Sequence, residues 1–506
     1  MRQRTTFFHT QENAIDPENV VVSGDSIQGP DIQAVREDRL TLQLEELPEE
    51  LAEFLGSCQG FHVRWISCES YDTVTPLVSR LPPGLHVFYT PQKDQIVSQP
   101  CTTLQSLFGG GVACVSLEDS FIELPRHRFA HSPAYQYYSP LSDLTQLVES
   151  ASKTLCGSQD ESSPCVSEVK RLNTARSLDF SYDAESKTIK TTAAWPQGKQ
   201  GISVSQISSH RIEVGILTTD SPPNLKPHEQ GIAGLLTVLG ESTKPTATLF
   251  AFSSRHRKAE GNSFSTAFLE PTGLHPTIQI KVVGLGSPLD GEDDDGIEEE
   301  CGLYAYFTLP RHIFADSYQL ADPLFLASKN LTTLSFMSQP VNLEAPEYVM
   351  DVWGSSLLLQ LAPPTGDDKT AAVGVWTAEV PLHLRYLDPK EGGYTNTSVP
   401  YPALFWACSA EEGAAFARSP FERVNLGYDG LFEPNTAFWH VDPTPLSKGG
   451  KLLNEVTVPV ADLDQAGWVS AGTAFVIFLG FGWIVGKLVV AWVDKKAPAT
   501  EEKKTQ

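Results

Sequence analysis

One segment near the C-terminus of this 506-residue chain constrains its fold more than any other. From Ala466 to Gly486 the sequence runs for 21 residues without a charged side chain. At about 1.5 Å per residue, a helix of this length spans the ~30 Å hydrocarbon core of a bilayer. Trp468 and Trp492 bracket the segment as interfacial aromatic residues do, and Lys487 lies close enough to its end to reach the surface. We predict a transmembrane helix here. The alternative is a buried helix of a soluble protein.

The remaining residues have the composition of a folded, acidic protein. Hydrophobic residues make up 41% and charged residues 20% of the chain, which is ordinary for globular domains. The 62 acidic and 37 basic side chains give a formal net charge of −25. Because this charge repels phosphate backbones and leaves no sizeable basic patch, we predict no nucleic-acid partner.

Hydrophobic periodicity predicts a mainly β fold. Residues 44–56 show helical spacing, whereas 61–68 and 85–91 alternate or run apolar like strands, so the N-terminal region is expected to be mixed α/β. From 275 to about 455, short apolar runs alternate with clusters of Pro, Gly, Asp and Asn. That pattern favours an antiparallel β-sandwich.

We predict five segments along the chain. The small, polar stretch 157–168 resembles a linker and sets the first boundary. The segments are a mixed α/β N-terminal region over 1–168, a strand-rich middle region over 169–268, a β-sandwich-like domain over 269–465, a transmembrane helix over 466–493 and a tail over 494–506.

Motifs that could carry catalysis or bind a metal are weak. Asp293 and Asp295 have the D-x-D spacing of some metal-binding transferases, but they lie in the acidic run Glu292–Glu300, where such a match arises by chance. His127 and His131 have the spacing of metal ligands on a helix, but flanking prolines make a helix there improbable. We therefore predict no catalytic residue, no metal site and no cofactor.

The eight cysteines include no C-x-x-C pair, so neither a zinc ribbon nor a thioredoxin-like site is indicated. Cys301 and Cys408 both fall in the β-rich region and are a disulfide candidate if that region lies in an oxidising compartment. Two buried free thiols are the alternative, and the sequence leaves both open. It also leaves open how the other six would pair, namely Cys58, Cys68, Cys101, Cys114, Cys156 and Cys165.

Two opposite topologies can be argued from the residues. Lysines after the apolar segment favour a cytosolic tail under the positive-inside rule, with the large domain in the lumen. The lack of an N-terminal signal sequence instead favours a tail anchor with a cytosolic body. Lys503 and Lys504, third and fourth from the end, form a K-K-x-x retrieval signal for the endoplasmic reticulum and favour the luminal body. The sequons at Asn330 and Asn396 are N-glycosylation candidates, although two sequons barely exceed chance.

The apolar segment also carries a possible contact face. Gly482 and Gly486 form a G-x-x-x-G pattern, which lets another membrane helix pack closely. Glycine is frequent in membrane helices, so the pattern alone does not establish a contact.

Several stretches of the second half resemble the PIG-X family, and the whole chain resembles its fungal form, named for a protease B non-derepressible phenotype. The L-P-x-x-x-F-x-D-x-Y core runs from Leu309 to Tyr318. The stretches that carry the resemblance are Leu274–Val282, Cys301–Leu320, Asn342–Val349 and Val380–Cys408, followed by the single apolar helix. They cover about 220 residues.

The resemblance implies a single-pass endoplasmic reticulum protein with a luminal body that functions in glycosylphosphatidylinositol (GPI) anchor synthesis. It implies a non-catalytic subunit that stabilises a polytopic mannosyltransferase of the PIG-M type, which adds the first mannose. One alternative is a general luminal chaperone that assists proteins such as vacuolar protease B. A further alternative is an enzyme of the same pathway that uses the acidic run.

Overall fold

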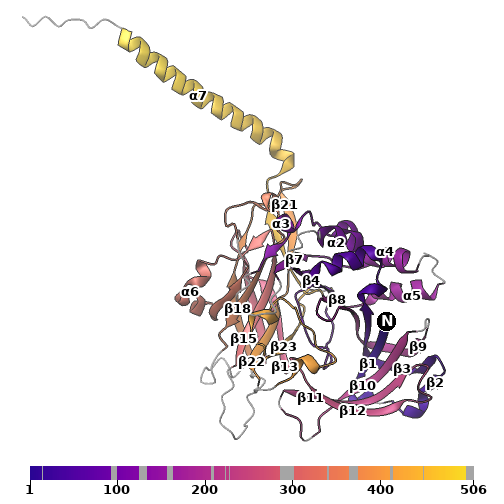
Figure 1. The fold of residues 1–506 in the computed structure, drawn as a ribbon. Coiled ribbons are helices and arrows are strands. Elements are labelled where there is room, and N and C mark those ends of the chain that lie inside the picture. The colour runs from indigo at the N-terminus through magenta and orange to yellow at the C-terminus, as the bar shows by residue number, and fades with distance from the viewer. Residues whose placement is uncertain are drawn as a thin grey trace, which may run out of the picture. The chain divides into compact units, whose positions relative to one another are not determined.

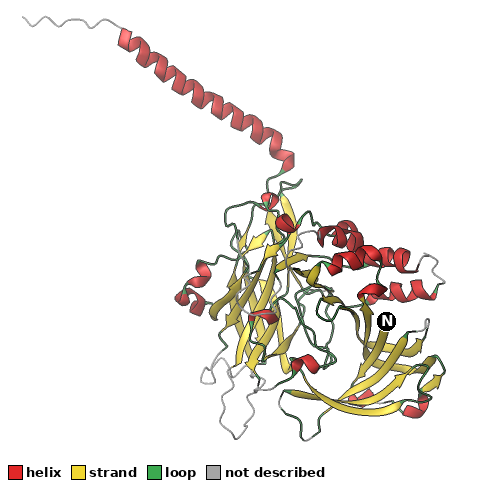
Figure 2. Ribbon diagram, in the orientation of Figure 1, coloured by secondary structure: helices red, strands yellow, loops and turns green. Residues whose placement is uncertain are grey.

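The computed structural model describes residues 1–13, 15–92, 100–124, 134–156, 163–206, 210–222, 224–226, 228–284, 301–338, 341–363, 374–410, 414–447 and 449–496. The chain forms two compact units. The first unit comprises Met1–Arg385 and Ser398–Glu455, and the second comprises Tyr386–Thr397 and the residues from Val456 on. Strands dominate the described part of the first unit (Figure 2).

A twelve-stranded sheet is built from the first half of the chain. Its order is β12-β11-β10-β1-β3-β9-β8-β4-β5-β7-β6, with β2 paired to β3 (Figure 1). The strands are β1 (Arg2–His9), β2 (Val21–Ser23), β3 (Ser26–Gln43), β4 (Cys58–Ile66), β5 (Gly84–Pro91), β6 (Ile122–Glu123), β7 (Tyr135–Ser139), β8 (Ser177–Asp183), β9 (Thr188–Ser205), β10 (Arg211–Asp220), β11 (Glu229–Val238) and β12 (Thr246–Ser253).

An eight-stranded sheet follows, in the order β17-β18-β15-β22-β23-β13-β14-β19. Two small ladders, β16-β20 and β21-β24, accompany it. The strands are β13 (His256–Phe268), β14 (Thr277–Val283), β15 (Cys301–Pro310), β16 (Ile313–Phe314), β17 (Leu331–Met337), β18 (Gly354–Leu361), β19 (Val375–Pro381), β20 (His383–Leu384), β21 (Tyr394–Pro400), β22 (Ala403–Ser409), β23 (Thr436–Pro443) and β24 (Leu453–Pro459).

The helices of the N-terminal region cover one face of the large sheet. On β4 the side chains of Phe61, Val63 and Trp65 point to that face because alternate residues of a strand face the same side. They pack in one core with Phe54 and Leu104, from α1 and α2. The helices of the first unit are α1 (Glu49–Gly56), α2 (Pro100–Phe108), α3 (Leu117–Ser120), α4 (Thr145–Cys156), α5 (Pro164–Lys170) and α6 (Pro323–Ser328).

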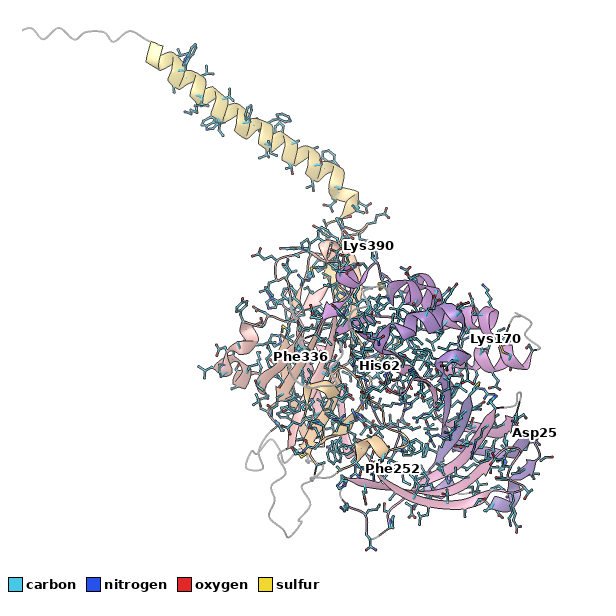
Figure 3. The ribbon with its side chains drawn as sticks, in the orientation of Figure 1. Asp25, His62, Lys170, Phe252, Phe336 and Lys390 are labelled. Carbon is cyan, nitrogen blue, oxygen red and sulfur yellow. A yellow bond between two sulfur atoms is a disulfide. The ribbon has the colours of Figure 1, made fainter. Side chains whose placement is uncertain are left out.

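The other face of β5 and β7 packs against the smaller sheet. Gln136 on β7 donates from Nε2 to the hydroxyl of Tyr306 on β15 at 3.1 Å, and its Oε1 accepts from Ser356 on β18 at 3.1 Å. The indole of Trp353 donates to the backbone carbonyl of Gln136 at 2.9 Å. These buried bonds satisfy polar groups that would otherwise be costly to bury, so the two sheets share one interior. Phe336 contributes to the apolar part of that interior (Figure 3).

The second unit contains α7 (Ala466–Lys496), the one helix in the described ranges that is long and apolar enough to cross a membrane. Its large apolar side chains are exposed, among them Phe478 and Trp483. A lipid environment removes the cost of that exposure. The helix fits a single-pass membrane protein.

The predicted fold class is confirmed. The chain is mainly β, with a mixed N-terminal region and one C-terminal apolar helix. Two details differ from the expectation. β1 pairs in parallel with β10, and β13 in parallel with β23, so the sheets are mixed. The predicted linker 157–168 ends early because α5 begins at Pro164, where proline at the first helical position and Ser163 before it are a helix-start signal.

The five-segment division stays a prediction. The segments 1–168 and 169–268 contribute strands to the same twelve-stranded sheet, while β13 belongs to the smaller one.

Candidate functional site

A row of polar residues crosses the inner face of the large sheet, opposite the helix-covered face. Strand register places these residues side by side on six consecutive strands. From β10 to β4 they are Glu213, Arg4, Arg39, Thr192, Asp179 and Arg64. Because neighbouring strands lie only about 4.8 Å apart, charged side chains in one such row must interact.

The connection between β22 and β23 covers this row. The carbonyl oxygen of Pro420 accepts hydrogen bonds from the guanidiniums of Arg4, at 2.9 Å, and Arg39. The carbonyl oxygen of Val424 accepts one from Arg64 at 2.6 Å. We call the described residues 414–435 of this connection the covering loop.

Aromatic contacts fix the same loop at a second point. The ring of Phe421 lies 5.2 Å from that of Phe8 and 5.6 Å from that of Phe252, and the guanidinium of Arg4 lies over it at 4.7 Å. Such ring and cation–π contacts add to the area that Phe421 buries. The covering loop is therefore held by both apolar and charged groups.

Beneath the loop lies a buried charge cluster of Arg4, Glu37, Arg39, Arg64, Asp179 and Arg423. Glu37 is fully buried and pairs with three guanidiniums, those of Arg4 at 3.5 Å, Arg39 at 3.7 Å and Arg423 at 3.4 Å. Asp179 pairs with Arg423 at 3.2 Å and with Arg64 at 3.3 Å. Four guanidiniums against two carboxylates give the cluster a formal charge of +2.

Burial affects the protonation of this region. It lowers the pKa of Arg39 to about 10, which leaves the guanidinium charged at neutral pH. Burial also lowers the pKa of Arg423, but Asp179 and Glu37 outweigh that effect and raise it overall. Burial, together with nearby Arg64, lowers the pKa of His62 to about 3, so this imidazole is neutral at neutral pH. His62 is buried in the first unit and is labelled in Figure 3.

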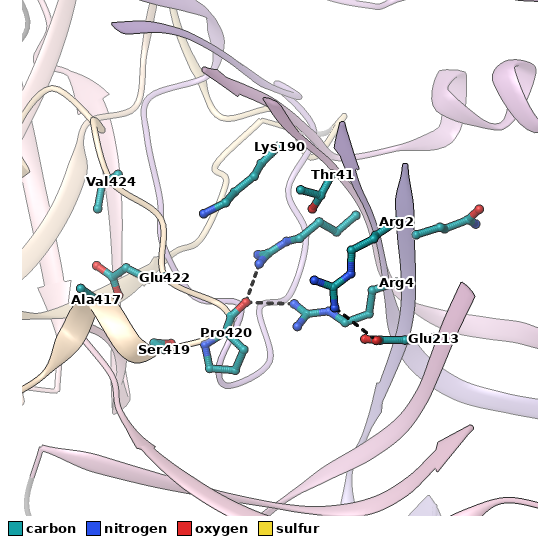
Figure 4. A pocket seen from close by; sticks show the side chains of 12 residues that line it. Arg2, Arg4, Thr41, Lys190, Glu213, Ala417, Ser419, Pro420, Glu422 and Val424 are labelled. Carbon is teal, nitrogen blue, oxygen red and sulfur yellow. Dashed lines mark hydrogen bonds and ion pairs between the residues drawn. The ribbon is translucent and has the colours of Figure 1, made fainter. Parts of the chain in front are cut away.

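A cavity of about 410 Å³ opens beside the cluster, between the sheet and the covering loop (Figure 4). Arg2, Arg4, Arg39 and Lys190 line it from the sheet. Glu422 lines it from the loop, and burial raises the pKa of its carboxyl to about 8, so this group is largely protonated at neutral pH. Four cations thus line one cavity.

The structure joins Cys301 and Cys408 in a disulfide. They are register partners on β15 and β22, with Cα atoms 4.2 Å apart. Further disulfides join Cys101 to Cys114 and Cys156 to Cys165. Cys58 and Cys68 remain thiols. Of the two alternatives for Cys301 and Cys408, the structure has the disulfide.

Both sequons lie on exposed positions, as an acceptor asparagine must. Asn330 is exposed just before β17, and its side-chain amide donates to the carbonyl of Thr377 at 2.7 Å. Asn396 is exposed on β21, where its side-chain oxygen accepts from the hydroxyl of Thr457 at 2.8 Å. Exposure permits modification of either residue but does not demonstrate it.

The other sequence-predicted residues are less informative. Gly482 and Gly486 lie in α7, and a Cβ added at either would meet no described atom within 4 Å. No group of three or more His, Cys, Asp or Glu in the described part of the chain is arranged to hold a metal ion. Residues that lie outside the described ranges are His127, His131, Asp293, Asp295, Lys503 and Lys504.

The charge cluster was not predicted from the sequence. A signal was present in residues 36–39 of β3, where Arg, Glu, Asp and Arg follow one another inside a strand. Alternation sends Arg36 and Asp38 to one face, where they pair at 2.7 Å, and Glu37 and Arg39 to the other. A run of charged residues ordinarily lies on a solvated surface. Here the covering loop buries one face of the run.

Fold and site together define a β-sheet protein with one candidate membrane helix, in which a loop of the C-terminal sheet covers a buried charge cluster of the N-terminal sheet. Its residues 271–489 match the model of the PIG-X / PBN1 family. The chain is 51% identical over 490 residues to Protein pbn1 of Neurospora crassa, covering 96% of this chain and 95% of that one. It is 43% identical over 511 residues to Protein PBN1 of Gibberella zeae, covering 100% and 99%. The chain belongs to the PIG-X / PBN1 family, which supports a role in GPI-anchor biosynthesis.

Proposed function

We propose that this protein is a non-catalytic subunit that stabilises the polytopic mannosyltransferase adding the first mannose to the GPI precursor. The observation that carries the proposal is family membership, because the matched residues 271–489 run from the smaller sheet to the apolar helix. An accessory role agrees with the single candidate span found among the described residues, since one helix encloses no cavity for two lipid-linked substrates.

We further propose that the body lies in the lumen of the endoplasmic reticulum and the tail in the cytosol, where Lys503 and Lys504 would act in retrieval. Support comes from the three disulfides, at Cys101–Cys114, Cys156–Cys165 and Cys301–Cys408. Disulfides persist in oxidising compartments and are rare in the cytosol.

This topology predicts that the protein carries N-glycans at Asn330 or Asn396. Glycosidase treatment is expected to increase the gel mobility of the wild type and to leave the Asn330→Gln/Asn396→Gln variant unchanged. A variant with an added sequon in the exposed turn at Lys187 serves as the control. If neither the wild type nor this variant shifts on glycosidase treatment, the result contradicts a luminal body.

A candidate partner surface lies on the family-matched region. Tyr318 is 79% and Leu324 is 83% exposed, at the adjacent short helices η6 (Gln319–Ala321) and α6. Large apolar side chains exposed together are typical of interaction sites. We propose that this surface and the Gly482/Gly486 face of α7 contact the mannosyltransferase.

Deleting the protein is expected to lower the cellular level of the mannosyltransferase several-fold, because an unassembled polytopic subunit would be degraded. Wild-type protein should restore the level on immunoblots, and a Tyr318→Ser/Leu324→Ser variant should not. Leu249→Ser on β12 is the matched control, since Leu249 is also exposed, at 63%, but lies outside the family-matched residues.

An unchanged mannosyltransferase level in the deletion strain would refute the stabilising role. Recovery of many client proteins without enrichment of the mannosyltransferase on affinity purification would favour the general chaperone instead.

A further inference from the structure

The buried charge cluster is not neutral by itself. Its four guanidiniums exceed its two carboxylates by two charges, in a chain whose formal net charge is −25. Burying charge without a partner is expensive, and like charges held close together in a protein interior repel each other. An acidic chain would be expected to supply the missing carboxylates, and among the described residues none forms a further ion pair with this cluster.

The excess positive charge faces the 410 Å³ cavity. Arg4 and Arg39 belong both to the cluster and to the cavity lining, and the Nε atoms of both are buried without a hydrogen-bond partner among the described residues. Lys190 adds a third cation, and no carboxylate in the described ranges forms an ion pair with it. In Figure 4 its ammonium points into the space between the sheet and the covering loop.

The acidic residues at the cavity do not cancel this charge. Glu213 already pairs with Arg2 at 3.5 Å and with Arg211 at 3.2 Å. Glu422 has a buried Oε1 without a hydrogen-bond partner in the described structure, and its raised pKa leaves it able to donate a proton in a hydrogen bond. A neutral carboxyl beside several cations suits an anion that would be repelled by a carboxylate.

We propose that this cavity binds the phosphate group of a small phosphate ester. Guanidiniums match phosphate oxygens geometrically, and a lysine ammonium supplies a point charge. A cavity of this volume falls in the range of small-molecule sites, so it accommodates a polar body attached to the phosphate. The side chains of Thr41 and Ser419 line the cavity and offer hydrogen bonds to hydroxyl groups of that body.

The phosphate ester could be a soluble molecule or the headgroup of a lipid, and the two share the chemistry that the cavity recognises. The binding is independent of the mannosyltransferase contact proposed above. Phosphate binding is measured on the purified protein alone, so a negative result there does not contradict the mannosyltransferase contact, and the reverse also holds.

The test uses the full chain purified in detergent, with unfolding followed by tryptophan fluorescence at constant ionic strength. Glucose 1-phosphate is expected to raise the midpoint of thermal unfolding in a saturable manner, whereas chloride is not. The Lys190→Gln variant should bind about tenfold more weakly, since one charge-assisted contact is lost. Lys281→Gln, which removes an exposed lysine from β14 of the other sheet, is the matched control and should bind like the wild type.

A charge reversal sharpens the test. Lys190→Glu should abolish the response to glucose 1-phosphate and, without ligand, should raise the midpoint of unfolding because it reduces the excess positive charge. A saturable response that is equal in wild type, Lys190→Gln and Lys190→Glu would overturn the proposal, as would the absence of any response in the wild type.

A further arm identifies the source of the phosphate ester. The chain is reconstituted in nanodiscs of phosphatidylcholine, with or without phosphatidylinositol, and titrated with glucose 1-phosphate. If the response to glucose 1-phosphate is lost only in the discs that contain phosphatidylinositol, the lipid headgroup occupies the cavity, which supports the site and identifies a lipid as its ligand. An undiminished response in both supports it with a soluble ester.

Discussion

Replacing Glu37 with glutamine is expected to lower the free energy of unfolding by roughly 3–5 kcal/mol, the range for breaking a buried ion pair by removing one partner. Glutamine keeps the shape of the side chain but removes the carboxylate that Arg4, Arg39 and Arg423 share. The formal charge of the cluster then rises from +2 to +3 around a side chain that is fully buried. Urea titration of the full chain in detergent, followed by tryptophan fluorescence, measures the loss.

Asp31→Asn is the matched control for this change. Asp31 also lies on β3 and pairs with Lys199 at 2.9 Å, but both side chains are more than half exposed. Exposed pairs contribute about 0–1 kcal/mol, so this variant should remain close to the wild type.

Removing one guanidinium in addition should partly restore the stability that Glu37→Gln loses. In the Glu37→Gln/Arg423→Met variant the cluster returns to +2, so its loss of stability should be smaller than the sum of the two single losses. Additive losses, or a Glu37→Gln variant as stable as Asp31→Asn, would mean that Glu37 does not neutralise the cluster.

Removing the Cys301–Cys408 disulfide is expected to cost about 4–5 kcal/mol in the chain-entropy model. The two cysteines are 107 residues apart, so the bond closes a long loop in the unfolded chain. It also joins β15 to β22 in the middle of the eight-stranded sheet. The Cys301→Ala/Cys408→Ala variant, unfolded in urea beside the wild type, gives the difference.

The Cys156→Ala/Cys165→Ala variant provides the comparison. Its bond spans 9 residues between α4 and α5, and the same model gives it roughly 2.5 kcal/mol. If the short-loop variant loses as much stability as the long-loop variant, constraint of the unfolded chain is not the source of the effect.

Much of the fold was predictable because its signals are local. Strand periodicity over 61–68 and 85–91 predicted β4 and β5 from a few residues each, because the alternation of side chains along a strand does not depend on which strand it pairs with. Which strands pair was not predictable. β1 lies between β3 and β10, so its parallel partner is some 200 residues away in the chain. The register between strands that are far apart in the chain depends on packing between segments, and no residue pattern at fixed spacing in the sequence indicates it.

The candidate site could be predicted only in fragments. The charged run on β3 was visible, but its ordinary interpretation is a solvated surface. The cavity needs Lys190 from β9 and Glu422 from the covering loop, and no spacing rule relates those positions.

The apolar helix and the β character of the chain were determined by the sequence alone, since the length of an uncharged segment and the alternation of side chains act within one element. The interior position of Glu37 was decided only by the tertiary structure. The carbonyl of Pro420 meets Arg4 across 416 residues of chain, and that contact closes the covering loop over the cluster. Burial gives the excess positive charge of this polar strand face a large effect, because charges interact more strongly in a protein interior than in water.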